Sequence, residues 1–120
     1  MNIDDYSFHD SKILSVTENT QDHYLDFLLD FPTNWQDNIF EPRTLRFTEV
    51  IFYNIDEIPY FEQPTILTII NLGQITKDFG TERNEFKVTR TKIEIQTTAG
   101  NRIIEYENCS LLIPDKSQQL

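Results

Sequence analysis

The sequence predicts an all-β domain, because apolar and polar residues alternate along much of it. Residues 24–31 read Tyr-Leu-Asp-Phe-Leu-Leu-Asp-Phe, so every second residue is apolar: Leu25, Phe27, Leu29 and Phe31. Successive side chains of a strand point to opposite faces, which gives this segment one apolar and one acidic face. No stretch shows helical periodicity over more than about two turns. We expect six or seven strands in an antiparallel β-sandwich or a strongly bent, partly closed barrel.

The first two strands are predicted to form a hairpin. Residues 12–18 make the first strand, with Leu14 and Val16 pointing inward. The polar residues 19–23 form the turn to the second strand. Pro32 ends that strand, because proline cannot donate to a ladder.

The third strand is expected after a loop that reaches Pro42. Residues 33–36, Thr-Asn-Trp-Gln, resemble a capping box that opens a single helical turn in this loop. The strand then covers residues 43–53, and its apolar phase slips by one residue, from Leu45 and Phe47 to Val50 and Phe52. No turn residue accompanies the slip, so we expect a β-bulge near Thr48-Glu49.

The second half of the chain is predicted to contain a central strand and a long hairpin. After an irregular connection over residues 54–64, residues 65–72 are almost continuously apolar. Such a run is typical of a central strand covered on both faces. A polar loop over residues 73–84 precedes the hairpin, which comprises a strand over 85–98, a turn over 99–101 and a return strand over 102–113.

A second bulge or bend is expected near Thr89 to Thr91, because the apolar positions change from even to odd numbers there. Phe86 and Val88 precede the change, and Ile93 and Ile95 follow it. The alternating strands together predict one core: Leu14, Val16, Leu25, Phe27, Leu29, Phe31, Phe47, Phe52, Ile70, Phe86, Val88, Ile93, Ile95, Ile104 and Tyr106.

Length and charge limit the functional classes. With 120 residues we expect one domain, with an N-terminal segment over 1–11 and a frayed tail over 115–120. The whole net charge of −10 lies in residues 1–62, which hold thirteen acidic and three basic residues. Such a surface repels phosphate backbones, so we expect no nucleic-acid binding, and it attracts a cationic protein. Alternatively, the charge serves only solubility.

The compartment is predicted from the cysteine content and the first residues. Cys109 is the one cysteine, so no intrachain disulfide can form, as is typical of reducing compartments. The first six residues contain neither a basic nor an apolar stretch, and we expect no signal peptide. No apolar run is long enough to span a bilayer. These features predict a cytoplasmic protein that does not enter a membrane.

The residues that could perform catalysis do not form a recognisable motif. His9-Asp10 matches the dipeptide of metal-dependent phosphohydrolases, but those sites need further ligands, and only His23 remains. We interpret His9 and Asp10 as capping the start of the first strand, with Asp10 accepting backbone N–H bonds. Cys109 is expected to be buried and inert, and the acidic pair Asp56-Glu57 lies in a predicted loop. The sequence therefore predicts no catalytic residue, no metal site and no cofactor.

One group of residues has the character of a binding surface. Along the second strand, the even-numbered residues point away from the face that carries Leu25, Phe27, Leu29 and Phe31. They are Asp22, Tyr24, Asp26, Leu28 and Asp30. An aromatic ring and a leucine between three aspartates resemble a small hot spot within an acidic rim, which suits a basic protein partner. Alternatively, a loop or the N-terminal segment covers this face, and Tyr24 and Leu28 pack beneath it.

About the first 30 residues resemble a group of small bacterial proteins. These proteins open with a similar His-Asp-Ser or His-Asp-Ala step before an alternating hairpin, which corresponds here to Phe8-His9-Asp10-Ser11, Ile13, Val16 and Leu25-Asp26-Phe27. Some of them are immunity proteins of polymorphic toxin systems, and the chain looks similar to the immunity protein 50 family. The resemblance implies a small, acidic, cytosolic protein that binds and blocks a toxin domain and catalyses nothing.

Three functions compete on this basis. The sequence favours a non-catalytic interaction protein that acts through its acidic half. The alternative is a β-barrel or sandwich that holds a small apolar ligand, and a large enclosed pocket lined by Phe side chains would favour it. An enzyme ranks last, because it requires a cleft that joins His9 or His23 to several acids. The sequence does not indicate the oligomeric state.

Overall fold

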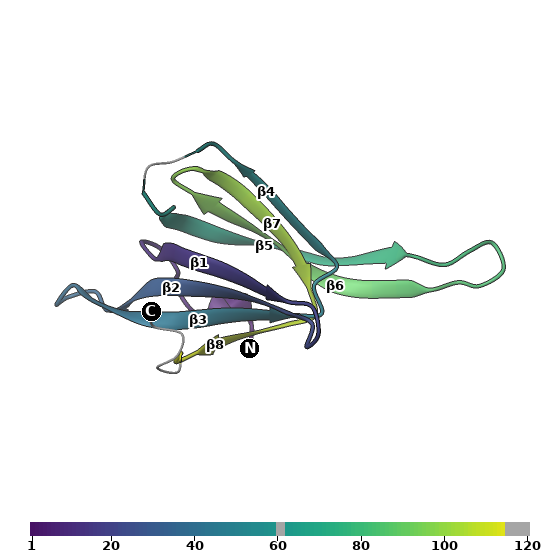
Figure 1. The fold of residues 1–120 in the computed structure, drawn as a ribbon, viewed down its shortest axis with the longest axis horizontal. Helices are drawn as coiled ribbons and strands as arrows, with labels where there is room; N and C mark the ends of the chain where they lie inside the picture. The colour runs from purple at the N-terminus through teal and green to yellow at the C-terminus, as the bar shows by residue number, and fades with distance from the viewer. Residues whose placement is uncertain (60–61, 115–120) are drawn as a thin grey trace.

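Two antiparallel sheets of four strands pack face to face in this protein (Figure 1). The computed structural model describes residues 1–59 and 62–114. One sheet has the strand order β1-β2-β3-β8, and the other has the order β4-β7-β6-β5. The elements are the 3-10 turn η1 (Ile3–Asp5), β1 (Lys12–Asn19), β2 (Tyr24–Asn34), β3 (Ile39–Thr48), β4 (Phe52–Glu57), β5 (Ile66–Asp78), β6 (Lys87–Thr97), β7 (Gly100–Tyr106) and β8 (Asn108–Leu112).

The predicted all-β class is confirmed, and the architecture is a sandwich with eight strands rather than six or seven. Over the described residues each sheet ends in two edge strands, so the sheets do not close into the alternative barrel. The tail predicted over residues 115–120 lies outside the described residues. No helix in the described ranges is long and apolar enough to cross a membrane.

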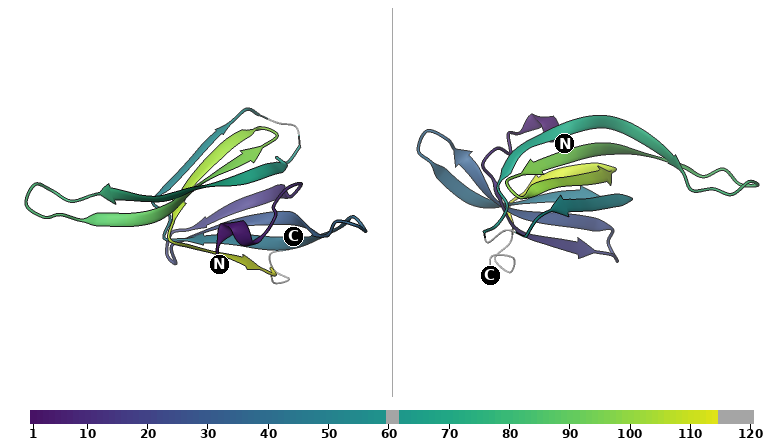
Figure 2. Two further views of the ribbon diagram at one scale, coloured as in Figure 1. Left: turned by 180° about the vertical axis from the view of Figure 1, so that it is seen from behind. Right: turned by 90° about the horizontal axis from the view of Figure 1, so that it is seen from above.

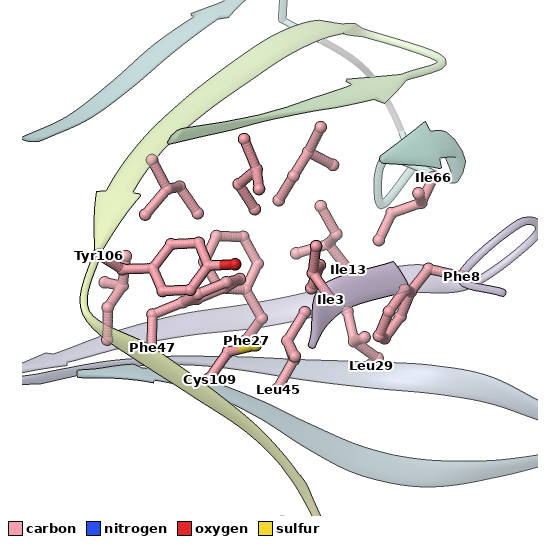
Figure 3. Packing of buried hydrophobic residues seen from close by; sticks show 14 of the residues in the cluster. Ile3, Phe8, Ile13, Phe27, Leu29, Leu45, Phe47, Ile66, Tyr106 and Cys109 are labelled. Carbon is pink, nitrogen blue, oxygen red and sulfur yellow. The ribbon is translucent and has the colours of Figure 1, made fainter. Parts of the chain in front are cut away.

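Side chains from both sheets fill the space between them (Figure 3). Phe27 of β2 packs edge to face against Phe47 and Tyr53, with ring centroids 5.7 and 5.9 Å away. The N-terminal segment adds Ile3 and Phe8 to this core. Most of the predicted core is buried: Leu25, Phe27, Leu29, Phe31, Phe47, Ile93, Ile95, Ile104 and Tyr106.

β1 and β2 form the predicted hairpin, but the inward side of β1 differs from the prediction. The register between the strands shifts between Ile13 and Ser15, which marks a β-bulge at Leu14. The bulge turns Leu14 outward, where it is 41 % exposed, so the prediction that it is buried is wrong. Ile13 is buried instead, and Val16 packs half-buried against the core.

β2 continues through Pro32, so the prediction that this proline ends the strand is wrong. β1 pairs with β2 only as far as Asp30, whereas β3 pairs with it along its whole length. Beyond Asp30, one edge of β2 has no neighbouring strand to which an N–H must donate. Proline, which has no N–H, is therefore tolerated there.

A tight hairpin turn joins β2 to β3, which corrects the predicted loop and helical turn. β3 already begins at Ile39, so Pro42 lies within a strand. In the turn, the Asp37 N–H donates to the side-chain oxygen of Asn34 at 3.0 Å. Asn38 adopts a left-handed conformation with φ of 55°, a geometry that asparagine tolerates well. Turn chemistry rather than helix capping explains the polar residues here.

The predicted single strand over residues 43–53 is in fact two strands in different sheets. β3 ends at Thr48 and β4 begins at Phe52, and between them Glu49 has a φ of 50°. The irregularity predicted near Thr48-Glu49 is thus confirmed as a break in pairing, and the phase slip reflects the change of sheet. Phe52 starts β4 on the outer face of the second sheet, so its predicted place in the core is wrong.

Three other boundaries also differ from the predictions. β4 extends through Glu57, so the first part of the predicted irregular connection is a strand. The predicted return strand over 102–113 is divided, because the chain leaves the second sheet after Tyr106 and continues as β8 in the first. Gly100 already begins β7 with a φ of 148°, and a Cβ there would clash with the Asp56 carbonyl oxygen. This position therefore requires glycine.

β5 lies at the edge of the second sheet, so the prediction of a central strand covered on both faces is wrong. It also includes residues 73–78, which were predicted as loop. The register shifts at Leu67 and at Leu72, and these two bulges contribute to the almost continuous apolar run. Ile66 faces the core, whereas Ile70, predicted as core, is exposed together with both bulged leucines.

The register between β6 and β5 is continuous from Lys87 to Lys92, so the bulge or bend predicted to interrupt pairing near Thr89 to Thr91 is wrong. Ile93 and Ile95 face the core, while Val88 of the same strand and Phe86, just before it, lie on the opposite face. β6 pairs with β7 only from Thr91, so both residues lie on the two-stranded part of the β5–β6 hairpin. This hairpin extends beyond the rest of the molecule in Figure 1. Phe86 is therefore exposed and Val88 half-buried, against the prediction that both are buried.

Candidate functional site

The predicted partner surface lies on the outer face of the first sheet. Tyr24, Asp26 and Leu28 of β2 line a shallow hollow of about 260 Å³, which we call the outer-face hollow. Its other lining residues come from β1 and β3: Ser15, Thr17, Glu18, Asn19 and Thr44. Asp30 follows Leu28 on the same face and is half-buried, and Asp22 is exposed in the turn before β2. The structure thus brings three of the five predicted residues together and places the other two beside them.

Arg46 holds Asp26 at the centre of this face. The two residues are directly opposite on β2 and β3. The guanidinium of Arg46 donates hydrogen bonds of 2.8 and 2.9 Å to the two carboxylate oxygens of Asp26. It also lies 3.8 Å from the ring centroid of Tyr24, within the range of a cation–π contact. The hydrogen bond with Asp26 raises the pKa of Arg46 above its ordinary value.

The charge of Asp26 is therefore compensated within the chain, and Asp26 is only 9 % exposed. The acidic character of the face comes from its margin, where Asp22 is exposed and Asp30 is half-buried. We call these two groups the marginal carboxylates. They lie beyond the two ends of the β2 row that lines the outer-face hollow. Glu18 also lines the hollow, but it pairs with Leu25, so its side chain belongs to the opposite face of β1.

Arg46 is the residue of this site that sequence reasoning missed. The sequence does contain a signal for its position, since Asp26 and Arg46 are equally far from Gln36, ten residues before it and ten after it. A hairpin centred on Gln36 places the two side chains opposite each other. The prediction of a loop before a strand starting at residue 43 concealed this register.

The N-terminal segment does not cover the outer face. Ile3 and Phe8 insert between the sheets, and η1 lies next to β5 (Figures 2 and 3). His9 then fastens the segment to the edge of β5, since its Nδ1 donates to the Leu67 carbonyl oxygen at 2.7 Å. The His9 ring also stacks on Trp35 in the β2–β3 turn, with centroids 6.1 Å apart. These contacts assign His9 a structural role between three parts of the fold.

Asp10 takes part in the same junction through its backbone. Its N–H donates to the Ile66 carbonyl oxygen at 2.9 Å, and its φ is 70°. The Asp10 carboxylate lies 3.4 Å from Nε2 of His9. Ile66 in turn donates its N–H to the Ser11 carbonyl oxygen at 2.7 Å. The segment predicted to cap the first strand thus joins the start of β1 to the start of β5.

A second hollow, of about 440 Å³, opens where the chain crosses between the sheets. We call it the junction hollow, and it is lined by Glu18, Asn19, Thr20, His23, Tyr24, Leu25, Glu49, Val50, Ile51, Phe52 and Tyr53. His23 and Glu49 are joined through their backbones, because the Glu49 N–H donates to the His23 carbonyl oxygen at 3.0 Å. Within the described ranges, no three or more His, Cys, Asp or Glu side chains are grouped so as to hold a metal ion.

A buried ion pair supports the inner face of the second sheet. Arg102 donates hydrogen bonds of 2.8 Å to both carboxylate oxygens of Glu57 and one of 3.0 Å to the Tyr53 hydroxyl. Burial acts to lower the pKa of Arg102, but the bonds with Glu57 and Tyr53 outweigh it, so that pKa is raised. Burial also raises the pKa of Tyr53. Each of these three side chains is hydrogen-bonded within the network, which indicates that the network has a structural role.

Cys109 lies in the core beside Tyr106 and is 2 % exposed, in accord with the expectation of a buried thiol. Its Sγ donates to the Met1 carbonyl oxygen at 3.4 Å. Burial raises the pKa of this thiol, which disfavours the nucleophilic thiolate.

Comparison of this chain with models of protein families, with curated proteins and with solved structures found no match.

Proposed function

We propose that this chain is a non-catalytic binding protein whose acidic outer face receives a cationic protein. The arrangement around Asp26 carries the proposal: Arg46 compensates the central charge and holds it in place, while the marginal carboxylates keep theirs near solvent. Tyr24 and Leu28 supply contact area between these charges. Charges around the margin of a surface mainly accelerate encounter with a partner of opposite sign, and salt weakens the effect.

The resemblance of the N-terminal residues to immunity proteins supports a narrower form of this proposal. In that form the partner is a cationic toxin domain, and the chain blocks the domain by covering a basic surface. The second predicted function, a site for a small apolar ligand, has less support. Phe27, Phe47 and Tyr106 pack against one another between the sheets, so these rings fill the interior.

The test uses charge reversal at the margin of the face. Asp22→Lys combined with Asp30→Lys changes two carboxylates that make no ion pair in the described structure. Asp26 is left unchanged, because a lysine there would place two cations against each other on a nearly buried site. The matched control is Asp56→Lys combined with Glu62→Lys, which makes the same charge change at exposed positions outside the first sheet.

Basic proteins captured from a bacterial lysate by the wild-type chain are then purified and titrated against all three forms. We expect the marginal variant to bind at least about tenfold more weakly and the control to bind like the wild type. If the captured protein inhibits growth, co-expression of the wild-type chain, but not of the marginal variant, restores growth. Equal binding by both variants would place the contact on another surface.

A further inference from the structure

Thr44 brings a buried hydroxyl without a partner to the outer-face hollow. The residue pairs with Leu28, so its side chain lies on the outer face, and it lines the hollow although it is only 4 % exposed. Within the described ranges its hydroxyl makes no hydrogen bond. A polar group buried in this way costs free energy in the folded chain, so its presence needs an explanation. A ligand in the hollow would supply the partner that the chain itself does not.

Two further hydroxyls line the same hollow from β1. Ser15 lies opposite Leu28, and Thr17 lies opposite Asp26. Both residues are exposed, and neither hydroxyl is bonded to another group of the described chain. A hydroxyl oxygen can accept hydrogen bonds through two lone pairs, so the hollow offers separate acceptors on its β1 side and on its β3 side.

Asp26 contributes a carboxylate that Arg46 uses only in part. The guanidinium donates one hydrogen bond to each carboxylate oxygen and lies over the ring of Tyr24. Leu28 and Thr44 lie on the other side of Asp26 along the strands, and Arg46 does not line the hollow. A carboxylate has about four lone-pair sites, so Asp26 can still accept a single donor from the hollow. It cannot receive the two parallel donors of a second guanidinium, because Arg46 already fills that position.

The charges around the hollow favour a cation. Arg46 lies opposite Asp26, and Lys12 lies opposite Asp30, so each of these basic residues stands beside an acidic one. Asp22, exposed in the turn before β2, adds a further negative charge at the end of the row. The face therefore attracts cations and repels anions.

A lysine side chain matches these groups better than an arginine side chain does. Its ammonium is a compact cation whose three donors can be directed to separate acceptors. Thr44 and Asp26 are diagonal neighbours on β3 and β2, near enough for one ammonium to contact both. A guanidinium instead carries its donors in a rigid, planar fork, which suits a paired acceptor. The carbon stem of a lysine can lie against Leu28 and Tyr24, the apolar members of the lining.

We propose that the outer-face hollow receives a lysine side chain of a cationic protein, whose ammonium donates to the Thr44 hydroxyl and to the Asp26 carboxylate. This inference rests on the proposed function, since it specifies which group of the cationic partner the acidic face recognises. The marginal carboxylates attract any cation, whereas the hollow distinguishes lysine from arginine. The bound lysine also satisfies the hydroxyl that the free chain leaves without a partner.

Three capped tripeptides that differ only in their central residue test the hollow. They are acetyl-Gly-Lys-Gly-amide, acetyl-Gly-Arg-Gly-amide and acetyl-Gly-Gln-Gly-amide, so the first two carry the same charge and the third carries none. NMR titration of the wild-type chain measures the affinity for each peptide and shows which backbone amides respond. We expect the lysine peptide to bind at least about fivefold more tightly than the arginine peptide, and the glutamine peptide to bind most weakly. The response is expected to gather at Ser15, Thr17 and Thr44.

Thr44→Val removes the hydroxyl and keeps the shape of the side chain. We expect this variant to bind the lysine and arginine peptides with similar affinity. In urea denaturation it is expected to be at least as stable as the wild type, because the hydroxyl has no partner to lose. The matched control is Thr48→Val, on the same face of the same strand but outside the hollow, and it is expected to keep the preference for lysine. Equal affinity of the wild type for the lysine and arginine peptides, a glutamine peptide that binds as well as the lysine peptide, or a preference that survives in Thr44→Val would each overturn the inference.

The charge reversal at Asp22 and Asp30 separates this inference from the proposed function. That variant is expected to weaken the lysine and arginine peptides to the same extent, because it changes the attraction for cations and leaves the hollow intact. A captured basic protein that needs the marginal carboxylates, together with peptides that show no preference for lysine, would overturn the inference and support the proposed function. A captured protein that does not need them, together with a preference that is lost in Thr44→Val, would support the lysine site and contradict the proposed function.

Discussion

Arg46 and Asp26 lie directly opposite each other on neighbouring strands, and two hydrogen bonds of 2.8 and 2.9 Å join the guanidinium to the carboxylate. Their side chains differ in exposure, with 29 % for Arg46 and 11 % for Asp26. Loss of the arginine leaves a nearly buried carboxylate without its partner. Loss of the aspartate leaves a cation that can turn towards water.

Arg46→Ala is therefore expected to lower the free energy of unfolding by about 1–3 kcal/mol, and Asp26→Ala by only about 1 kcal/mol. Urea denaturation of the two single variants and the double variant measures these losses and the coupling between the residues. Equal losses in the two single variants would show that the carboxylate reaches water without its partner.

The pair of Arg102 and Glu57 is more deeply buried, with 9 % exposure for each side chain. Arg102→Ala leaves the Glu57 carboxylate uncompensated, and we expect it to lower the free energy of unfolding by about 3–5 kcal/mol. Arg43→Ala is the control, because its partner Glu41 is half-exposed and such pairs contribute at most about 1 kcal/mol. Chemical denaturation compares the two variants, and losses of similar size would contradict the structural role of the buried pair.

Phe27 and Leu14 were both predicted as core residues, and the structure distinguishes them. Phe27→Ala empties a fully buried aromatic site and is expected to cost about 3–5 kcal/mol of unfolding free energy. Leu14 points outward at a bulge, so Leu14→Ala is expected to cost less than about 1 kcal/mol. Thermal and urea unfolding measure both, and a large loss for Leu14→Ala would mean that the bulge is misplaced.

The fold class and the inner face of β2 could be predicted because alternation is a local property. The alternation within β2 alone is enough to show that Leu25, Phe27 and Leu29 share one face of the strand. Alternation does not say whether another sheet covers that face. Phe86 and Val88 alternate as well as Ile93 and Ile95 do, yet they lie on the two-stranded part of the β5–β6 hairpin, where no second sheet covers them. A regular strand was therefore interpreted as a bulged or bent one.

The same limit applies to the candidate site. Tyr24, Asp26 and Leu28 could be grouped from parity along one strand, and the structure places them in one hollow. Arg46 belongs to the next strand, so its position depends on the register between strands, which a misread turn conceals. The change of sheet after Thr48 was visible as a phase slip, but a slip does not distinguish a bulge from a crossing.

Cys109 provides a simple measure of the integrity of the core. Its thiol is 2 % exposed and burial raises its pKa, so we expect very slow reaction with a thiol reagent at neutral pH. The thiol is expected to react in step with unfolding when urea is added. Rapid modification of the native chain would show that the N-terminal residues, which accept the bond from Cys109 through Met1, leave the core readily.

Cys109 and its neighbour Tyr106 also predict how stability depends on pH. Burial raises the pKa of both groups in the folded chain. An unfolded chain releases these protons near about pH 8.5 and pH 10 respectively, while the folded chain retains them. Above those values the unfolded state binds fewer protons than the folded state, so the free energy of unfolding falls as pH rises.

We expect urea denaturation to show no contribution from these groups below about pH 8 and a decline from about pH 9 upwards. Tyr106→Phe with Cys109→Ala reduces this decline, whereas Tyr6→Phe, at an exposed tyrosine, leaves it unchanged. A decline that is equally steep in all three forms would assign the alkaline sensitivity to other groups.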